Sequence, residues 1–220
     1  MESLAGVKSN ETSHRPASAI AFARLNCPVP LRDLQADIAF LTHQPWLDHV
    51  NRRDYQGGWD VLPLRCQRQH ADAHPLLQGF AIGTGDEWRN LPVLQKCPAI
   101  AALLAGLNCP LQAVRLMRLR AGAVIKPHRD HGLSLENGEA RLHLPIHYSD
   151  DILFNVDRQP VPMRAGELWY INADREHEVR NNGASDRINL VIDCIANDWL
   201  HQQIHVAPVS SRCNTEAISA

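Results

Sequence analysis

From residue 112 onward, hydrophobic and polar positions alternate in short runs that turn-forming residues separate. Successive residues of a strand point to opposite faces, so this alternation predicts β-strands. Gly122, Gly138, Gly166 and Gly183 punctuate the runs, as expected of turns. Many short strands without intervening helices predict an antiparallel sandwich or jelly roll. The predicted strands cover residues 114–119, 141–148, 152–156, 167–172 and 187–195.

The N-terminal half follows a different pattern. Residues 31–43 place Leu31, Leu34 and Ile38 at helical spacing, and residues 98–107 begin with a proline suited to a first helical turn, so both segments are predicted to be helices. Residues 46–90 show no clear periodicity, apart from a short predicted strand over residues 59–65. The sequence thus predicts a mainly β protein with N-terminal helices.

Four segments follow from these patterns. Residues 1–18 are polar and mixed, which predicts a disordered leader. A helical and mixed part is expected over residues 19–111, packed on a β core over residues 112–198. Residues 199–220 are expected to form a loosely structured C-terminal tail.

Composition narrows the classes of function. The 220 residues carry a formal net charge of -2, which gives no electrostatic reason to expect a nucleic acid or an anionic membrane as partner. No apolar run approaches the roughly 20 residues of a membrane span, and the N-terminus lacks the features of a secretory signal, so a cytoplasmic location is expected. The six cysteines are scattered without a CxxC pair and are predicted to be free, mostly buried thiols.

The most informative polar residues are His128, Asp130 and His177. Two residues apart on an extended strand, His128 and Asp130 point to the same face, and His177 would join them from a distant strand end. Two imidazoles and one carboxylate are the ligands that hold non-haem Fe(II) on one face and leave the other positions open. The alternatives are zinc in the same set, or two surface polar residues and an unrelated histidine.

Two alternating strands carry a second group of polar residues. In residues 141–148, Arg141 and His143 share one face, and in residues 187–195 Arg187 occupies the face opposite the apolar positions. An arginine fork recognises a carboxylate in a bidentate manner, so these residues suit a dicarboxylate beside the metal. The alternative is that these polar faces are exposed to solvent.

Together these motifs resemble the aspartyl/asparaginyl β-hydroxylase family of Fe(II)- and 2-oxoglutarate-dependent dioxygenases, whose bacterial members include proline cis-hydroxylases. The resemblance covers roughly residues 112–195 and implies a double-stranded β-helix, a cupin-like jelly roll. It also implies that His128, Asp130 and His177 bind iron, that Arg187 binds the distal carboxylate of 2-oxoglutarate, and that Arg141 and His143 steady its iron-bound end. The matching segments are residues 115–119, 127–130, 141–143, 166–169 and 187–193, with Gly122 and His177.

Two positions depart from the animal enzyme of that family. Asp130 supplies a carboxylate ligand that the animal enzyme lacks, so the chain is more similar to the bacterial branch that acts on small molecules. Met117 stands where the animal enzyme has a serine that helps to bind the distal carboxylate. The resemblance further implies that residues 19–111 contact the substrate, with candidates His49, Asn51, Asp54, Tyr55, Trp59 and Arg65.

The predicted function is hydroxylation of a C–H bond with O2 and 2-oxoglutarate, yielding succinate and CO2. The substrate is expected to be an aspartyl or asparaginyl residue or another amino acid, free or in a peptide, and the sequence does not choose among them. Nor does it predict an oligomeric state. The competing hypotheses are a jelly-roll metal-binding or sensor module without turnover, and a cupin-like zinc or manganese isomerase.

Overall fold

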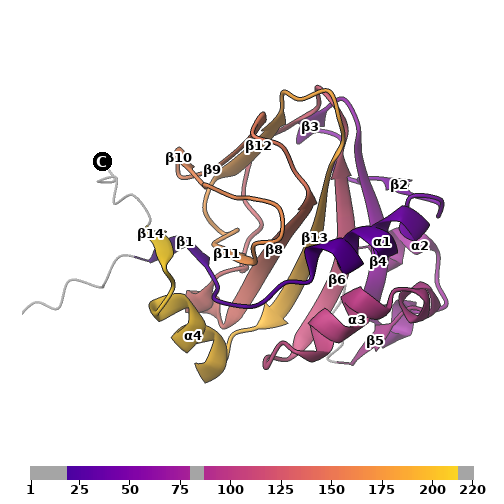
Figure 1. Ribbon diagram of the computed structural model, residues 1–220, viewed down its shortest axis with the longest axis horizontal. Coiled ribbons are helices and arrows are strands. Elements are labelled where there is room, and N and C mark those ends of the chain that lie inside the picture. Colours follow the sequence, from indigo (N-terminus) through magenta and orange to yellow (C-terminus); the bar gives the residue numbers. More distant parts are fainter. Residues whose placement is uncertain (1–18, 80–86, 213–220) are drawn as a thin grey trace, which may run out of the picture.

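Two antiparallel β-sheets form the body of the computed structural model, which describes residues 19–79 and 87–212 (Figure 1). The larger sheet has the strand order β14-β1-β11-β8-β13-β6-β4-β2, with β5 paired to β4, and the smaller has the order β10-β9-β12-β7-β3. The larger sheet comprises β1 (Ile20–Arg24), β2 (Leu47–Asp48), β4 (Trp59–Gln67), β5 (Trp88–Asn90), β6 (Leu111–Leu119), β8 (Glu139–His147), β11 (Trp169–Ile171), β13 (Arg187–Ile195) and β14 (Val209–Arg212). The smaller sheet comprises β3 (Tyr55–Gln56), β7 (Val124–His128), β9 (Ile152–Val156), β10 (Gln159–Pro160) and β12 (His177–Asn181).

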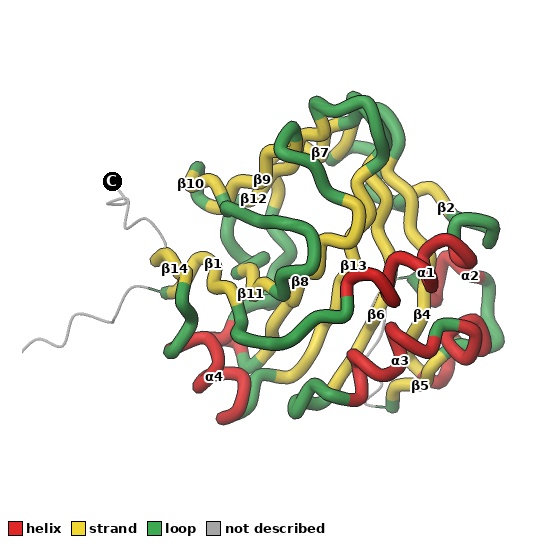
Figure 2. The backbone as a smooth tube through the Cα atoms, in the orientation of Figure 1, coloured by secondary structure: helices red, strands yellow, loops and turns green. Residues whose placement is uncertain are grey.

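Helices α1 (Leu31–Leu41), α3 (Pro98–Ala105) and α4 (Asp198–His205) pack on the side of the larger sheet that faces away from the smaller one (Figure 2). The short helix α2 (Pro75–Gln78) contacts β4, and short 3-10 turns lie at Arg68–His70, Pro92–Lys96 and Leu135–Asn137. The buried Asp37 of α1 accepts a hydrogen bond of 2.8 Å from the backbone N–H of Ile100 in α3. It thereby satisfies one of the free N–H groups in the first turn of α3.

Two separate hydrophobic clusters correspond to the two sides of the larger sheet. One joins α1, α3 and α4 to alternate residues of the central strands, among them Leu116, Leu144 and Leu190. The other fills the space between the sheets and includes Leu119 and Val191 of the larger sheet and Phe154 of the smaller one. The central strands are therefore buried on both faces, and the inner cluster surrounds the space in which the polar residues of the sequence motifs lie.

The structure confirms the mainly β fold with antiparallel sheets. The strands over residues 152–156 and 187–195 have the predicted bounds, and the predicted helices correspond to α1 and α3. The five cysteines in the described residues are free, as predicted, while Cys213 lies outside the described residues. None of the helices in the described part of the chain combines the length and apolar character that crossing a membrane requires.

One expectation differs from the structure. The C-terminal segment expected to be loose contains α4 and β14. Asn197 caps α4 by accepting from the N–H of Leu200 at 3.0 Å, and β14 pairs with β1.

The short strand predicted over residues 59–65 is confirmed as β4, which extends to Gln67 and pairs with β6. The larger sheet therefore crosses the predicted boundary at residue 112, and the functional division there stays a prediction. The predicted leader lies outside the described residues.

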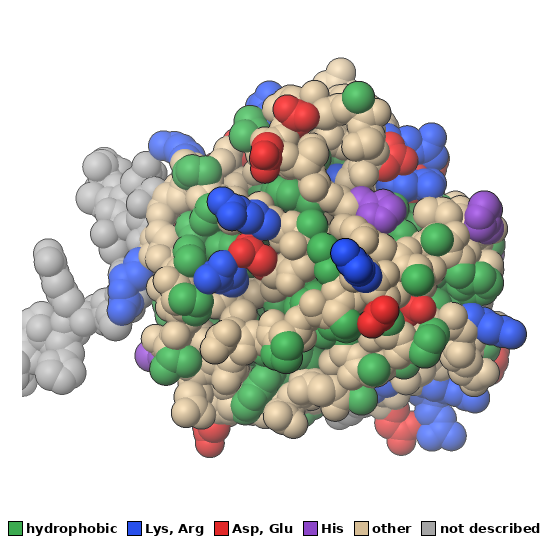
Figure 3. Space-filling model, viewed as in Figure 1, with side chains coloured by type: hydrophobic (Ala, Val, Ile, Leu, Met, Phe, Trp, Pro, Cys, Tyr) green, Lys and Arg blue, Asp and Glu red, His purple; other side chains and the backbone are tan. Residues whose placement is uncertain are grey.

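The surface seen in Figure 3 intersperses acidic and basic side chains. On that face the basic side chains do not gather into one broad patch.

Candidate metal centre and its cavity

A cavity of about 260 Å³ opens between the two sheets. Its lining includes all six residues that the sequence motifs predicted for metal and co-substrate: His128, Asp130, Arg141, His143, His177 and Arg187. These residues come from β7, β8, β12 and β13 and from the segment after β7, so the antiparallel topology collects them from widely separated parts of the chain. Their assignment to metal and co-substrate stays a prediction.

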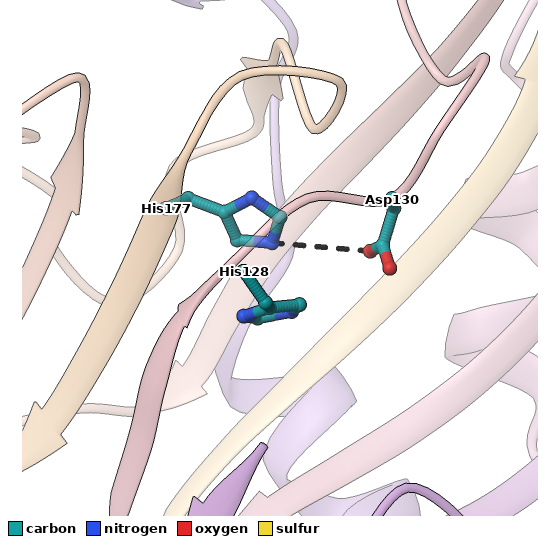
Figure 4. Close-up of side chains that lie close together, drawn as sticks. All are labelled: His128, Asp130 and His177. Atoms are coloured by element: carbon teal, nitrogen blue, oxygen red, sulfur yellow. Dashed lines mark ion pairs between the residues drawn. The ribbon is translucent and has the colours of Figure 1, made fainter. Parts of the chain in front are cut away.

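The pairing of β7 with β12 places His128 opposite His177 (Figure 4). Their ring centroids are 4.2 Å apart, and Asp130 Oδ2 lies 3.8 Å from His177 Nε2. One ligand atom from each of the three residues lies within 4.8 Å of the other two. This is a compact set of two nitrogens and one oxygen, suited to a single divalent metal ion.

Two details of this set differ from the sequence-based expectation. β7 ends at His128, so Asp130 lies beyond the strand. Its backbone N–H donates to the carbonyl of Ala173 at 2.8 Å, which holds the segment in place. His177 begins the strand adjacent to β7 in the same sheet, so neighbouring strands, and not facing sheets, bring the two imidazoles together.

The two imidazoles present the same ring nitrogen to the cavity. His128 Nδ1 lies 2.8 Å from the carbonyl of Lys126, and His177 Nδ1 lies 2.9 Å from the carbonyl of Arg175. A neutral imidazole that donates from Nδ1 keeps the Nε2 lone pair for a metal. Burial, with the neighbouring His128, lowers the pKa of His177 to about 4. His177 is therefore neutral, as a metal ligand must be, at physiological pH.

Behind Asp130 lies a chain of buried ion pairs. Arg141 Nη1 contacts the Asp130 carboxylate, while Arg141 Nε and Nη2 donate to Asp193 at 2.7 and 3.0 Å. Arg115 Nη1 donates to Asp193 at 2.9 Å. Burial alone would raise the pKa of the Asp130 carboxyl, but the charge of Arg141, with His177 and His128, holds it below its ordinary value. Asp130 is therefore an anion that Arg141 orients.

Arg187 is the opposite case, because its guanidinium is buried without an ionic partner among the described residues. The residue is 3% exposed, and its Nε and Nη2 have no hydrogen-bond partner. The guanidinium carbon lies 5.8 Å from the Tyr148 ring centroid and 5.7 Å from that of Phe154. Burial lowers the pKa of Arg187 to about 10, so it stays charged at neutral pH. A buried, unpaired guanidinium is costly, and an anionic ligand would remove that cost.

The cavity wall nearest the N-terminal segment is aromatic. His49 stacks on Trp59 with ring centroids 3.5 Å apart, and the Tyr55 ring meets both edge-on. Of the substrate-contact candidates, His49, Asn51 and Trp59 line the cavity, whereas Asp54, Tyr55 and Arg65 do not. Arg65 instead donates to Asn90 at 2.7 Å.

The sequence motifs did not assign a role to Arg115 and Asp193. Arg115 lines the cavity and is 3% exposed, and Asp193 is 2% exposed. The sequence did contain one sign of their role, since each is a charged residue within a mostly apolar strand, where burial is expected. Their contact spans 78 positions of sequence, so no local pattern could pair them.

A comparison with known structures finds several that are similar to this chain. The chain is similar to an oxidoreductase of the 2OG-Fe(II) oxygenase family from Burkholderia pseudomallei, at 16% identity over 80% of this chain and 85% of that one, with a TM-score of 0.52. It is also similar to HygX from Streptomyces hygroscopicus, solved with nickel and 2-oxoglutarate bound, at 11% identity over 82% and 84% with a TM-score of 0.46. A third similar structure is the non-heme alpha ketoglutarate dependent epimerase SnoN from nogalamycin biosynthesis, at 13% identity over 89% and 88% with a TM-score of 0.48.

A comparison with protein families gives a more specific result. The family described as aspartyl/asparaginyl beta-hydroxylase matches residues 32–197, a range that contains the three candidate ligands, the buried ion pairs and Arg187. This match supports an oxidoreductase function of the 2OG-Fe(II) oxygenase type. Because it spans most of the chain, the protein belongs to the aspartyl/asparaginyl beta-hydroxylase family.

Proposed function

We propose that this protein is an Fe(II)- and 2-oxoglutarate-dependent dioxygenase that hydroxylates a C–H bond of an amino-acid substrate. The observation that carries the proposal is the content of one cavity. It brings together a histidine–aspartate–histidine set and the unpartnered buried guanidinium of Arg187. Either feature alone is compatible with several functions. Three metal-ligand residues and a free guanidinium in one cavity, however, suit a dicarboxylate that binds the metal at one end and the guanidinium at the other.

The three ligand residues would hold the metal. His128 and His177 would bind through Nε2, because their Nδ1 atoms face backbone carbonyls. Asp130 would add one negative charge, and its contact with Arg141 keeps the carboxylate oriented. When bound, Fe(II) supplies the activation of O2 and the oxidative decarboxylation of 2-oxoglutarate to succinate and CO2 that drive the hydroxylation.

Arg187 would bind the distal carboxylate of 2-oxoglutarate. Its unpartnered Nε and Nη2 atoms form one edge of the guanidinium fork, which matches the two oxygens of a carboxylate. His143 lines the same cavity, and its Nδ1 has no partner among the described residues. It remains available to the metal-bound end of the co-substrate. Arg141, by contrast, is already engaged by Asp130 and Asp193.

The substrate would enter beside the aromatic wall of His49 and Trp59. Asn51 offers an amide on the same wall, so the wall combines flat apolar surface with a hydrogen-bonding group. These features suit a small-molecule amino acid or a peptide side chain, with aspartyl and asparaginyl residues as the first candidates to test.

The decisive experiment measures succinate from 2-oxoglutarate after anaerobic purification and reconstitution with Fe(II). We expect succinate to form, and to increase with an accepted amino-acid or peptide substrate. Metal binding without succinate formation would favour a sensor module. Bound zinc or manganese with turnover that does not need 2-oxoglutarate would favour an isomerase.

Two variants locate the chemistry. His177→Ala should abolish succinate formation, because it removes a metal ligand, while His205→Ala, an exposed histidine of α4, should not change it. Full turnover by His177→Ala would exclude the proposed metal site.

Arg187→Ala should chiefly raise the 2-oxoglutarate concentration needed for half-maximal rate, by about 10- to 100-fold for one lost charged hydrogen-bonding partner. Arg164→Ala removes an exposed arginine and serves as the matched control. An unchanged 2-oxoglutarate requirement in Arg187→Ala would move the co-substrate site elsewhere.

A further inference from the structure

Asn189 is a buried polar side chain that the proposed chemistry has not used. It lies in β13 and is 0% exposed. Neither Nδ2 nor Oδ1 of its amide has a hydrogen-bond partner within the described part of the chain. Buried polar groups in folded proteins nearly always have partners, so each exception requires a physical reason.

The strand register places Asn189 on the face of the larger sheet that looks toward the smaller sheet. Its neighbours at positions 188 and 190 belong to the outer hydrophobic cluster with the helices, whereas Val191 belongs to the inner cluster. Asn189 therefore shares the inner face with Arg187 and Val191. Arg187 lines the cavity and likewise has unpartnered donor atoms.

The lateral neighbours of Asn189 cannot satisfy its amide. Asn189 pairs with Met117 of β6 on one side and with Pro145 of β8 on the other. Neither of these side chains carries an N–H or O–H group, and the backbone groups of the central strand serve the sheet. A leucine of similar volume would pack there without the desolvation cost of an amide. Packing therefore does not account for asparagine at this position.

The cavity supplies the missing partner if an anion occupies it. Met117 and Arg187, which flank Asn189, both line the cavity, whereas Asn189 itself is not among the lining residues. A carboxylate has about four lone-pair sites, and the fork of one arginine occupies two of them. The remaining sites can accept an amide N–H, while a spare guanidinium N–H can donate to the amide oxygen. One bound carboxylate would thus satisfy both unpartnered side chains.

We propose that Asn189 is a further co-substrate-binding residue, whose amide N–H donates to the carboxylate that Arg187 binds. This inference rests on the proposed function, because it takes 2-oxoglutarate as the ligand at the Arg187 end of the cavity.

The test compares Asn189→Leu with the wild-type protein, both loaded with Co(II) to prevent turnover, by calorimetric titration with 2-oxoglutarate. We expect the dissociation constant for 2-oxoglutarate to rise about 10- to 100-fold, as for the loss of a hydrogen bond to a charged group. The matched control ligand is 2-oxobutyrate, which lacks the distal carboxylate, and its affinity should change by less than about twofold. Asn189→Ser retains an O–H donor and should weaken 2-oxoglutarate less than Asn189→Leu does.

The outcomes separate this inference from the proposed function. If the Co(II)-loaded wild-type protein does not bind 2-oxoglutarate, the proposed function fails. If the wild-type protein binds it and Asn189→Leu binds it equally well, only the role of Asn189 fails. Equal weakening of 2-oxoglutarate and 2-oxobutyrate would also overturn it. The thermal unfolding of the metal-free variants reports folding, and Asn189→Leu should be at least as stable as the wild-type protein, because it buries no unpaired amide.

Discussion

The two faces of β13 are equally buried but are occupied in opposite ways. On the outer face, Ile188, Leu190 and Ile192 are at most 3% exposed and pack in the cluster that includes the helices. On the inner face, Arg187 and Asp193 are also at most 3% exposed. Burial alone therefore does not distinguish a structural position from a functional one in this strand. A structural position differs from a functional one in whether other residues of the protein supply the hydrogen-bond or ionic partners of the buried side chain.

The inner face contains both a buried charge that has partners within the protein and one that lacks an ionic partner. Asp193 is fully satisfied, because it accepts three hydrogen bonds from Arg115 and Arg141. Burial alone would raise the pKa of the Asp193 carboxyl, but the two arginines hold it well below its ordinary value. Arg187, six positions earlier, has no such partner among the described residues. Under the proposed function a bound carboxylate would be the partner of Arg187, and this buried residue would then be a binding residue.

The largest effect is expected for Asp193→Ala. It leaves the buried guanidinium of Arg115 without its anion and leaves Arg141 with Asp130 as its anion, which should lower the free energy of unfolding by about 3–5 kcal/mol. The measurement is urea unfolding of the metal-free protein. Asp150→Ala is the control, because this carboxylate is exposed, and a change within about 0.5 kcal/mol is expected. Equal losses in both variants would contradict the importance of the buried network.

The next effect is expected on the outer face. Leu190→Ala removes a side chain that is 0% exposed and should cost about 3 kcal/mol of unfolding free energy through lost burial and a residual cavity. The affinity for 2-oxoglutarate should stay within about twofold of the wild-type value at temperatures where the variant is folded. A large loss of that affinity would show that the two faces are coupled, and that β13 does not separate a structural face from a binding face.

The smallest effect concerns His49 in the aromatic wall. Burial, with the nearby Arg115, lowers its pKa from 6.5 to about 3, so the folded protein keeps it neutral while the unfolded chain protonates it below pH 6.5. The contribution of neutral His49 to the free energy of unfolding is therefore fully present above pH 6.5 and is lost as the pH falls toward 3. Between pH 6.5 and 5 the metal-free wild-type protein should lose about 1.5 kcal/mol more than His49→Gln. If denaturant titrations at pH 6.5 and pH 5 show the same loss of unfolding free energy in the wild-type protein and in His49→Gln, the prediction is wrong.

The sequence predicted best where one pattern ran without interruption. β9 and β13 are mostly apolar runs between polar segments, so their bounds matched the prediction. β7 and β12 are no shorter than β9, but they were missed because β7 contains Lys126 and Pro127, and β12 contains Glu178 and Arg180. α4 was missed although Asn197 and Asp198 form a recognisable helix start. β4 was predicted over residues 59–65, and only its last two residues, Cys66 and Gln67, were missed.

The site was predictable to the extent that its residues form local motifs. His128 and Asp130 are two positions apart, and Arg141 and His143 lie two apart on β8. The contact of Asp193 with Arg115 depends on the order of the strands, because β13 lies between β8 and β6. Likewise, nothing in the sequence distinguishes the satisfied Asp193 from the unsatisfied Arg187. That difference is a property of the packed sheets.

The continuity of β13 has a consequence for how this enzyme can diversify. Arg187 and Asp193 stand at two ends of the same inner face, six residues and so about 20 Å of strand apart. Both β6 and β8 pair with β13 along this stretch, with register shifts at Ile188/Asn189 against β8 and at Ile192/Cys194 against β6. Inserting one residue would exchange the two faces of the strand beyond the insertion. The proposed co-substrate end and the proposed metal end of the cavity are therefore constrained together, because both depend on the register of β13. The wall formed by His49, Asn51 and Trp59 belongs to a different part of the chain, where loops and a strand end can vary. New substrates can arise there while the oxidative machinery stays unchanged.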